Sequence, residues 1–241
     1  MSLIKIEIAE KVFEIKTIAP CANRMWHLFA TDKPADFRIQ TTIKDLDHEC
    51  LLTSELENGS YSHKSEIEIA AIHRKVCEKL IDFSTFMIHG AAFSVGDKGI
   101  LLCAKSGTGK TTHLFNWLDH CPDVKVINGD KPFILAKEDP IIYGSPWAGK
   151  ENMCNNAICP LRTIAFMYRG EENKIEEISF SDAFPFLLQH VYRSNDSEKM
   201  HRTLQMLKSL NGKVHFYRFQ SNNFKEDSFS KAYKAFVGDE K

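Results

Sequence analysis

Residues 98–130 read KGILLCAKSGTGKTTHLFNWLDHCPDVKVINGD, and several local patterns follow one another within them. The apolar run 100–103 has the length of a buried strand, and the glycine-rich residues 104–111 come directly after it. Residues 111–120 read as a short helix, and 124–127 form another apolar run. Strand, loop, helix and strand in this order are typical of an α/β nucleotide-binding core.

The loop 104–111 matches the phosphate-binding pattern G-x-x-x-x-G-K-[ST], with Ala104 in place of the first glycine. In such a P-loop the backbone N–H groups and the helix N-terminus face phosphate, the lysine reaches the β- and γ-phosphates, and the hydroxyl residue holds Mg²⁺. Alanine fits the first position only if its φ is negative. We therefore predict binding of ATP and Mg²⁺, the alternative being a turn that binds nothing. The predicted nucleotide-binding residues are Ser106, Gly107, Thr108, Gly109, Lys110, Thr111 and Thr112.

A nucleotide-bound metal ion needs oxygen ligands from the protein, and Thr111 supplies one hydroxyl. Asp130 follows the apolar run 124–127, where P-loop proteins place an acidic metal ligand. We predict that Thr111 and Asp130 hold Mg²⁺. The alternative is that the tripeptide 128–130 is only a turn that ends a strand.

The surroundings of this loop resemble those of a known group of proteins. His89-Gly90, the strand 100–103, the segment 106–112 and the strand ending near Asp130 are similar to HPr kinase/phosphorylase and the ATP-dependent phosphoenolpyruvate carboxykinases. Residues 143–150 and 160–162 resemble uncharacterised bacterial members of the HPr-kinase-like branch. The resemblance covers roughly residues 85–170 and implies the P-loop fold of that group, ATP, Mg²⁺, and transfer of the γ-phosphoryl group to a serine hydroxyl.

The same resemblance implies a catalytic set of Lys110, Asp130 and His89, with the histidine close to the phosphates. The family has two consecutive aspartates where this chain has Gly129-Asp130, so the aspartate that serves the family as base is replaced. His89 would then accept the proton. The alternative for His89 is a histidine with satisfied hydrogen bonds inside the apolar strand 86–93.

Three functions stay open at this point. The first is a kinase that phosphorylates a hydroxyl of a protein, peptide or small molecule, with His89 or Asp130 assisting deprotonation. The second is a nucleotide-binding regulatory module without catalysis, because Gly129 replaces the aspartate. The third is a carboxykinase-like metabolic enzyme, which the length disfavours. The acceptor is unknown, and the hexamers of the kinase branch imply a homo-oligomer.

Three further segments have two interpretations each. Trp147 and Lys150 lie in a Gly- and Pro-rich loop expected on the P-loop side, where they either contact the nucleotide or form a structural turn. Arg162 either faces phosphate or marks the start of a strand. The alternating run 215–219 favours an amphipathic strand over an RNA-stacking surface.

The composition limits the class of protein. The 241 residues include 31 Lys and Arg against 32 Asp and Glu, a formal net charge of −1, so we expect no nucleic-acid partner. The N-terminus lacks a signal-like segment and no apolar run has the length of a membrane span, so we expect a cytoplasmic protein without a membrane partner. The seven cysteines are scattered, and we expect reduced thiols.

Periodicity along the chain suggests two parts. Residues 1–83 form a small β-rich segment with a hairpin over 3–18, a strand near 38–43, a turn at 57–60 and one helix that starts at Ser65. Residues 84–241 form the P-loop domain, an α/β unit with a mixed sheet and flanking helices. Its further elements are expected as strands at 86–93, 133–135, 141–143, 161–168 and 214–219, and as helices from 181, at 197–210 and at 224–236.

Overall fold

The protein is seen in a computed structural model, which describes residues 3–18, 24–57, 64–222 and 227–238. The strands are β1 (Leu3–Ile8), β2 (Lys11–Lys16), β3 (Phe37–Gln40), β4 (Thr85–Met87), β5 (Ala91–Val95), β6 (Lys98–Cys103), β7 (Val124–Asn128), β8 (Phe133–Leu135), β9 (Ile141–Tyr143), β10 (Ile158–Arg169), β11 (Lys174–Ile178) and β12 (His215–Ser221). The helices are α1 (Ile43–Glu57), α2 (Lys64–Leu80), α3 (Lys110–His120), α4 (Phe180–His190), α5 (Ser197–Lys208) and α6 (Asp227–Phe236), with short 3-10 helices η1 (Arg24–Phe29) and η2 (Ile81–Phe83).

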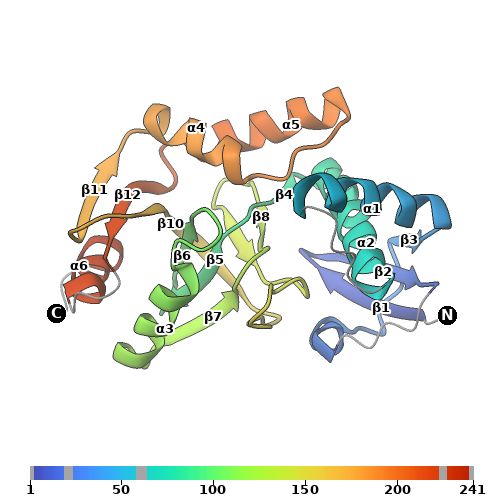
Figure 1. Ribbon diagram of the computed structural model, residues 1–241, viewed down its shortest axis with the longest axis horizontal. Coiled ribbons are helices and arrows are strands. Elements are labelled where there is room, and N and C mark those ends of the chain that lie inside the picture. The colour runs from blue at the N-terminus through green and yellow to red at the C-terminus, as the bar shows by residue number, and fades with distance from the viewer. Residues whose placement is uncertain (1–2, 19–23, 58–63, 223–226, 239–241) are drawn as a thin grey trace.

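The N-terminal residues form a three-stranded sheet in the order β1-β2-β3 at one end of the long axis, beside α1 and α2 (Figure 1). β1 and β2 pair antiparallel as the alternation predicted, and they bury Ile6, Ile8, Phe13 and Ile15. The expected strand near 38–43 ends at Gln40, and it is followed by α1, a helix that the sequence did not predict. Most positions of α1 are polar and several of its apolar side chains are exposed, so the helical period is weak in the sequence.

The main sheet is mixed, as expected, and its strand order explains where the P-loop lies. β6 pairs parallel with β10 on one side and antiparallel with β5 on the other, and β5 pairs antiparallel with β7. β6, β7 and β10 therefore end at one edge of the sheet, and β5 starts there. Ligands of α/β proteins bind at the carboxyl ends of strands, so this edge is the expected place for a site.

The apolar run 86–93 is not one strand, which corrects the sequence prediction. β4 pairs with β8, whereas β5 pairs with β6 and β7, and the chain changes partners at His89-Gly90. A Cβ on Gly90 would lie 2.8 Å from the Leu102 carbonyl oxygen, so only glycine permits this close passage. His89 consequently lies between two strands at the edge where β6 ends.

Helices cover the sheet on both faces and divide its core. α4 and α5 bury one face against residues that include Ile164 and Phe166 of β10. α3 and α6 bury the other face, where Trp117 and Phe236 pack near Met167. The expected flanking helices are thus present, and Figure 1 shows α4 and α5 along one side of the sheet with α3 and α6 apart from them.

A third apolar cluster runs from the N-terminal sheet into the main sheet. Its members include Phe13 and Ile72 from the N-terminal part and Phe133 and Trp147 from the part after residue 83. The division at 83/84 stays a prediction, because this core is continuous across it.

Other expectations concern the whole chain. None of the helices in the described ranges combines the length and the apolar character needed to cross a lipid bilayer. Six cysteines are free thiols within those ranges, and Cys21 lies outside them. Most of the expected turn at 57–60 and the start of the expected helix at 224 also lie outside the described residues.

Candidate functional site: a phosphate loop between two cavities

The P-loop connects β6 to α3, and its backbone has the conformation that its glycines permit. Gly107 and Gly109 have φ of +75° and +109°, in the left-handed region that favours glycine. Ala104 is buried and has no positive φ, so alanine meets the condition set for the first position of the pattern. α3 begins at Lys110, and its first N–H groups and helix dipole provide an anion site beside the loop.

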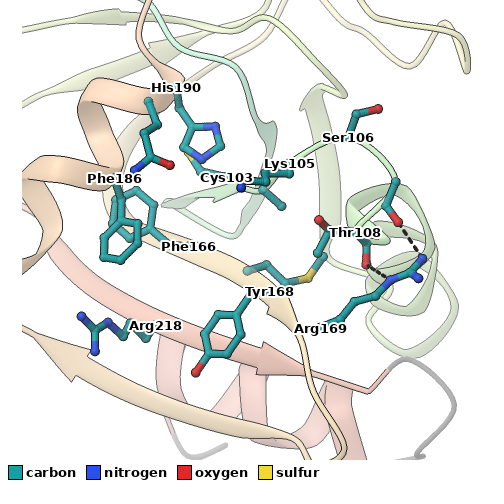
Figure 2. Close-up of a pocket in the computed structure, with 14 residues that line it drawn as sticks. Cys103, Lys105, Ser106, Thr108, Phe166, Tyr168, Arg169, Phe186, His190 and Arg218 are labelled. Atoms are coloured by element: carbon teal, nitrogen blue, oxygen red, sulfur yellow. Dashed lines mark hydrogen bonds between the residues drawn. The ribbon is translucent and has the colours of Figure 1, made fainter.

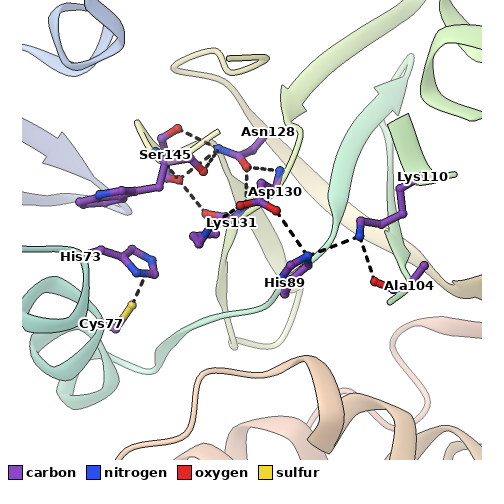
Figure 3. Close-up of polar contacts among 10 residues, drawn as sticks. His73, Cys77, His89, Ala104, Lys110, Asn128, Asp130, Lys131 and Ser145 are labelled. Carbon is purple, nitrogen blue, oxygen red and sulfur yellow. Dashed lines mark hydrogen bonds and ion pairs between the residues drawn. The ribbon is translucent and has the colours of Figure 1, made fainter. Parts of the chain in front are cut away.

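Lys110 bends back from the first turn of α3 toward the sheet edge (Figure 3). Its Nζ donates a hydrogen bond of 2.9 Å to the Ala104 carbonyl and lies 3.4 Å from His89 Nε2. Burial lowers the pKa of Lys110 from its usual 10.5, while Asp130 opposes this shift. The ammonium is therefore held at the mouth of the loop, where a phosphate would meet it.

His89, between β4 and β5, and Asp130, just after β7, approach each other. The His89 Nε2 and Asp130 Oδ1 atoms are 3.4 Å apart, and the Gly90 N–H donates to the Asp130 carbonyl at 2.9 Å. Burial is the main cause that lowers the pKa of His89 from 6.5, Lys110 and Lys131 lower it further, and Asp130 raises it. The imidazole is accordingly neutral at pH 7 and able to accept a proton.

The turn that carries Asp130 is braced by Asn128. The Asn128 Oδ1 accepts hydrogen bonds from the N–H groups of Asp130 (2.8 Å) and Lys131 (2.6 Å), and its Nδ2 donates to the Ser145 carbonyl at 2.8 Å. Gly149 lies against the aspartate, since a Cβ there would come within 3.1 Å of Asp130 Cβ. The tripeptide 128–130 is thus a structural turn, and that turn also presents a carboxylate to the loop.

A cavity of about 780 Å³, called here the phosphate cavity, brings most of the predicted site residues together. Its lining comprises Glu66, His89, Ser106, Gly107, Gly109, Lys110, Thr111, Thr112, Gly129, Asp130, Lys131, Gly149, Lys150, Glu151 and Arg169. Thr108 is the predicted loop residue that does not line it. Lys150 lies on the P-loop side as expected.

Two other candidates lie elsewhere. Trp147 is buried among aromatic rings, with Trp26 at 6.2 Å and Phe133 at 6.3 Å between centroids, so its structural interpretation holds. Arg162 forms an ion pair with Asp139, and it lies beside the start of β6 rather than its end. A phosphate-facing role for Arg162 is therefore wrong, because it is at the opposite edge of the sheet.

Several charged residues of the site were not predicted from the sequence, and Arg169 is the most informative of them. Its Nη2 donates to the Gly107 carbonyl at 2.6 Å and its Nε to the Thr108 carbonyl at 3.4 Å. Arg169 is the last residue of β10, which runs parallel to β6. Only this pairing places Arg169 beside the P-loop, and the sequence does not reveal which strands pair. Lys131, whose ammonium pairs with the Asp130 carboxylate, was also missed although it follows directly in the sequence.

A second cavity, of about 700 Å³, lies on the other side of the P-loop and is called here the aromatic cavity (Figure 2). It is lined by Cys103, Ala104, Lys105, Ser106, Gly107, Thr108, Phe166, Met167, Tyr168, Arg169, Phe186, Gln189, His190 and Arg218. Ser106, Gly107 and Arg169 line both cavities. The two cavities therefore meet at the loop.

The donor set fits Mg²⁺ bound together with a nucleotide. Mg²⁺ is usually held by one or two carboxylates, substrate phosphates and water, and the Asp130 carboxylate with the Thr111 hydroxyl suits that requirement. Across the described ranges no cluster of three or more His, Cys, Asp and Glu side chains is arranged to hold a metal ion.

Comparison with known proteins adds a distant likeness. No protein-family model matches the chain. No curated protein matches it. Solved structures that match include the HPr(Ser) kinase/phosphatase from Coxiella burnetii, which is 10% identical over 62% of this chain and 90% of that chain, with a TM-score of 0.33. At that TM-score we infer the function from the residues of this chain alone.

Proposed function

We propose that the protein is an ATP-dependent phosphotransferase that moves the γ-phosphoryl group to a hydroxyl group. One observation carries this proposal: Lys110, His89 and Asp130 converge in one cavity at the P-loop and the N-terminus of α3. A phosphate cradle alone serves binding, whereas a neutral imidazole beside it also serves proton transfer.

The chemical step assigns a task to each of these residues. The acceptor oxygen bonds to the γ-phosphorus while the bond from that phosphorus to the β,γ-bridging oxygen breaks, and ADP leaves with the electron pair. His89 Nε2 takes the hydroxyl proton, and the N–H groups of the loop together with Lys110 stabilise the negative charge on the phosphate. Mg²⁺ held by Thr111 and Asp130 would neutralise further charge on the phosphate oxygens. A serine hydroxyl as acceptor stays a prediction.

The binding half of the proposal is tested with Lys110→Ala. Loss of the ammonium removes a charge-assisted contact worth about 1.5–3 kcal/mol, so MgATP affinity should fall roughly ten- to hundredfold in calorimetry. Lys125→Ala, which removes an exposed lysine of β7, is the control and should bind as the wild type does. Equal affinities for the two variants would mean that the loop is not the nucleotide site.

The alternative function is a regulatory module that binds nucleotide without catalysis, and Gly129 is the observation that favours it. A Cβ at Gly129 would lie 3.4 Å from the Ala148 carbonyl and from Met153, in ordinary contact, so the backbone admits an aspartate there. Transfer of labelled phosphate from ATP into a cell lysate separates the two functions. Transfer by the wild type supports the kinase, and transfer only by Gly129→Asp supports the regulatory module.

A further inference from the structure

The charges around the aromatic cavity are unbalanced. Its lining contains three cationic side chains, Lys105, Arg169 and Arg218, and no aspartate or glutamate. Arg169 donates to loop carbonyls, and no ion pair is formed by Lys105 or Arg218 within the part of the chain that the structure describes. A cavity with cations of this kind in a chain of net charge −1 favours an anionic ligand.

The rest of the wall is apolar and aromatic. The rings of Phe166 and Phe186 lie 5.2 Å apart between centroids, and the Arg218 guanidinium lies 5.5 Å from the centroid of Phe186. Tyr168 completes the same side of the cavity, as Figure 2 shows. Such a wall binds an apolar or aromatic body, while the guanidinium at its edge binds a carboxylate or phosphate.

The position of the aromatic cavity also suits a second substrate. It meets the phosphate cavity at Ser106, Gly107 and Arg169. His190, which lines the aromatic cavity, has its ring 6.4 Å from the His89 ring between centroids, so a group bound there comes close to the proposed base. The phosphate cavity continues past the loop to Thr112 and Lys150, and its volume of about 780 Å³ leaves room for the nucleotide itself.

We propose that the aromatic cavity binds the phosphoryl acceptor, and that this acceptor is a hydroxyl-bearing organic anion with an apolar body. The inference rests on the proposed function. The apolar body packs against the adjoining rings of Phe166 and Phe186, the anionic group pairs with Arg218, and the hydroxyl faces the place where the two cavities meet. In the transfer its oxygen bonds to the γ-phosphorus, ADP leaves, and His89 takes the proton.

The test uses calorimetry on the full chain with MgADP and with four probe acids. 3-Phenyllactate and 2-hydroxyisocaproate carry a hydroxyl, a carboxylate and an apolar body, whereas lactate and glycerate lack the body. The first two should bind at least tenfold more tightly than the last two. 3-Phenyl-1,2-propanediol, which lacks the carboxylate, should bind at least tenfold more weakly than 3-phenyllactate.

Variants locate the binding. Arg218→Gln and Phe186→Leu should each weaken 3-phenyllactate binding at least tenfold and leave the MgADP affinity unchanged. Arg202→Gln, an exposed arginine of α5 away from both cavities, is the control and should bind both ligands as the wild type does. Arg218 is exposed, so its replacement tests the cavity even if Phe186→Leu impairs folding.

Every other outcome contradicts the acceptor class, the role of the aromatic cavity or the proposed function. If no probe acid binds with a Kd below about 1 mM while MgADP binds, the assigned acceptor class is wrong and the proposed function stands. If Arg218→Gln or Phe186→Leu weakens MgADP instead, the cavity holds the nucleoside. If a peptide with a C-terminal carboxylate binds there and the free acids do not, the acceptor is a peptide. Failure of MgADP to bind the wild type refutes the proposed function itself.

Discussion

At the scale of single residues, the site depends on three side chains whose charges are coupled. Lys110 lies between the Ala104 carbonyl and the His89 ring, and His89 in turn lies next to Asp130. Burial keeps the imidazole neutral, and the nearby ammonium groups act in the same direction. A neutral base next to a phosphate loop is the arrangement that proton abstraction from a hydroxyl requires.

His89→Asn should separate binding from catalysis. Asparagine keeps a hydrogen-bond donor but cannot take the proton, so phosphoryl transfer should fall about 10²–10⁴-fold while MgATP affinity is retained. Labelled-phosphate transfer and calorimetry measure the two quantities. His120→Asn, on the exposed end of α3, is the control. Transfer at the wild-type rate in His89→Asn would assign deprotonation to Asp130.

The pH dependence follows from the direction of the His89 shift. The base acts when neutral, so activity is present above its pKa and is lost as the pH falls through that value. Since the pKa lies below 6.5 in the protein without nucleotide, kcat/KM should be flat near neutrality and fall in acid, with a midpoint below 6.5. The pH profile of kcat/KM is the measurement, and a midpoint above 6.5 contradicts the assignment. His89→Asn should lack this acid limb.

At the scale of elements, the directions of the strands determine which residues meet at the site. β6 and β10 run parallel, so the P-loop and Arg169 follow the two strands at the same edge. β5 runs in the opposite direction between β6 and β7, so His89 enters from its start and Asp130 from the end of β7. Four segments distant in sequence therefore supply one site.

Arg169→Gln should show that β10 supports the loop. The substitution weakens the hydrogen bonds to the Gly107 and Thr108 carbonyls. Because the arginine is exposed, we expect a cost of about 1 kcal/mol, which is roughly a fivefold loss of MgATP affinity in calorimetry. Arg162→Gln makes the same change near the other end of the same strand and should leave the affinity unchanged. An equal loss in both variants would point to a general effect on β10.

At the scale of the whole molecule, the N-terminal segment is joined to the P-loop sheet through a shared core. His73 of α2 is buried there, with its ring 4.8 Å from Trp147 and 6.3 Å from Phe133 between centroids. Burial lowers its pKa to about 3. Glu66, from the start of the same helix, lines the phosphate cavity, so α2 connects this core with the site.

This buried imidazole makes the stability of the molecule depend on pH. The folded pKa is depressed, so its contribution is present above the unfolded value of about 6.5 and is lost as the pH falls toward 3. Between pH 7 and pH 5 the loss should be about 2 kcal/mol in the free energy of unfolding. Urea unfolding at the two pH values measures this loss. The change in the free energy of unfolding between pH 7 and pH 5 should be about 2 kcal/mol smaller in His73→Phe than in the wild type. His201→Phe, which replaces an exposed histidine of α5, is the control and should behave as the wild type does.

The sequence was sufficient for the features that depend on neighbouring residues. Gly107 and Gly109 set the loop conformation, Lys110 begins the helix that follows, and strict alternation determines the hairpin of β1 and β2. The structure contains each of these as predicted, because turn chemistry and period act within one or two turns of chain. The same reasoning did not predict α1, whose helical period is weak, since its apolar residues Ile43 and Leu51 are exposed while Glu49 is buried.

Only the tertiary structure shows which residues make up the site. The break between β4 and β5 at His89, the position of Arg169 beside the loop and the aromatic cavity formed by α4, β10 and β12 all follow from which distant strands pair. Local pattern carries no information on the partner or direction of a distant strand. That choice rests on burying the faces of the sheet under α3, α4, α5 and α6, a free energy shared by the whole molecule.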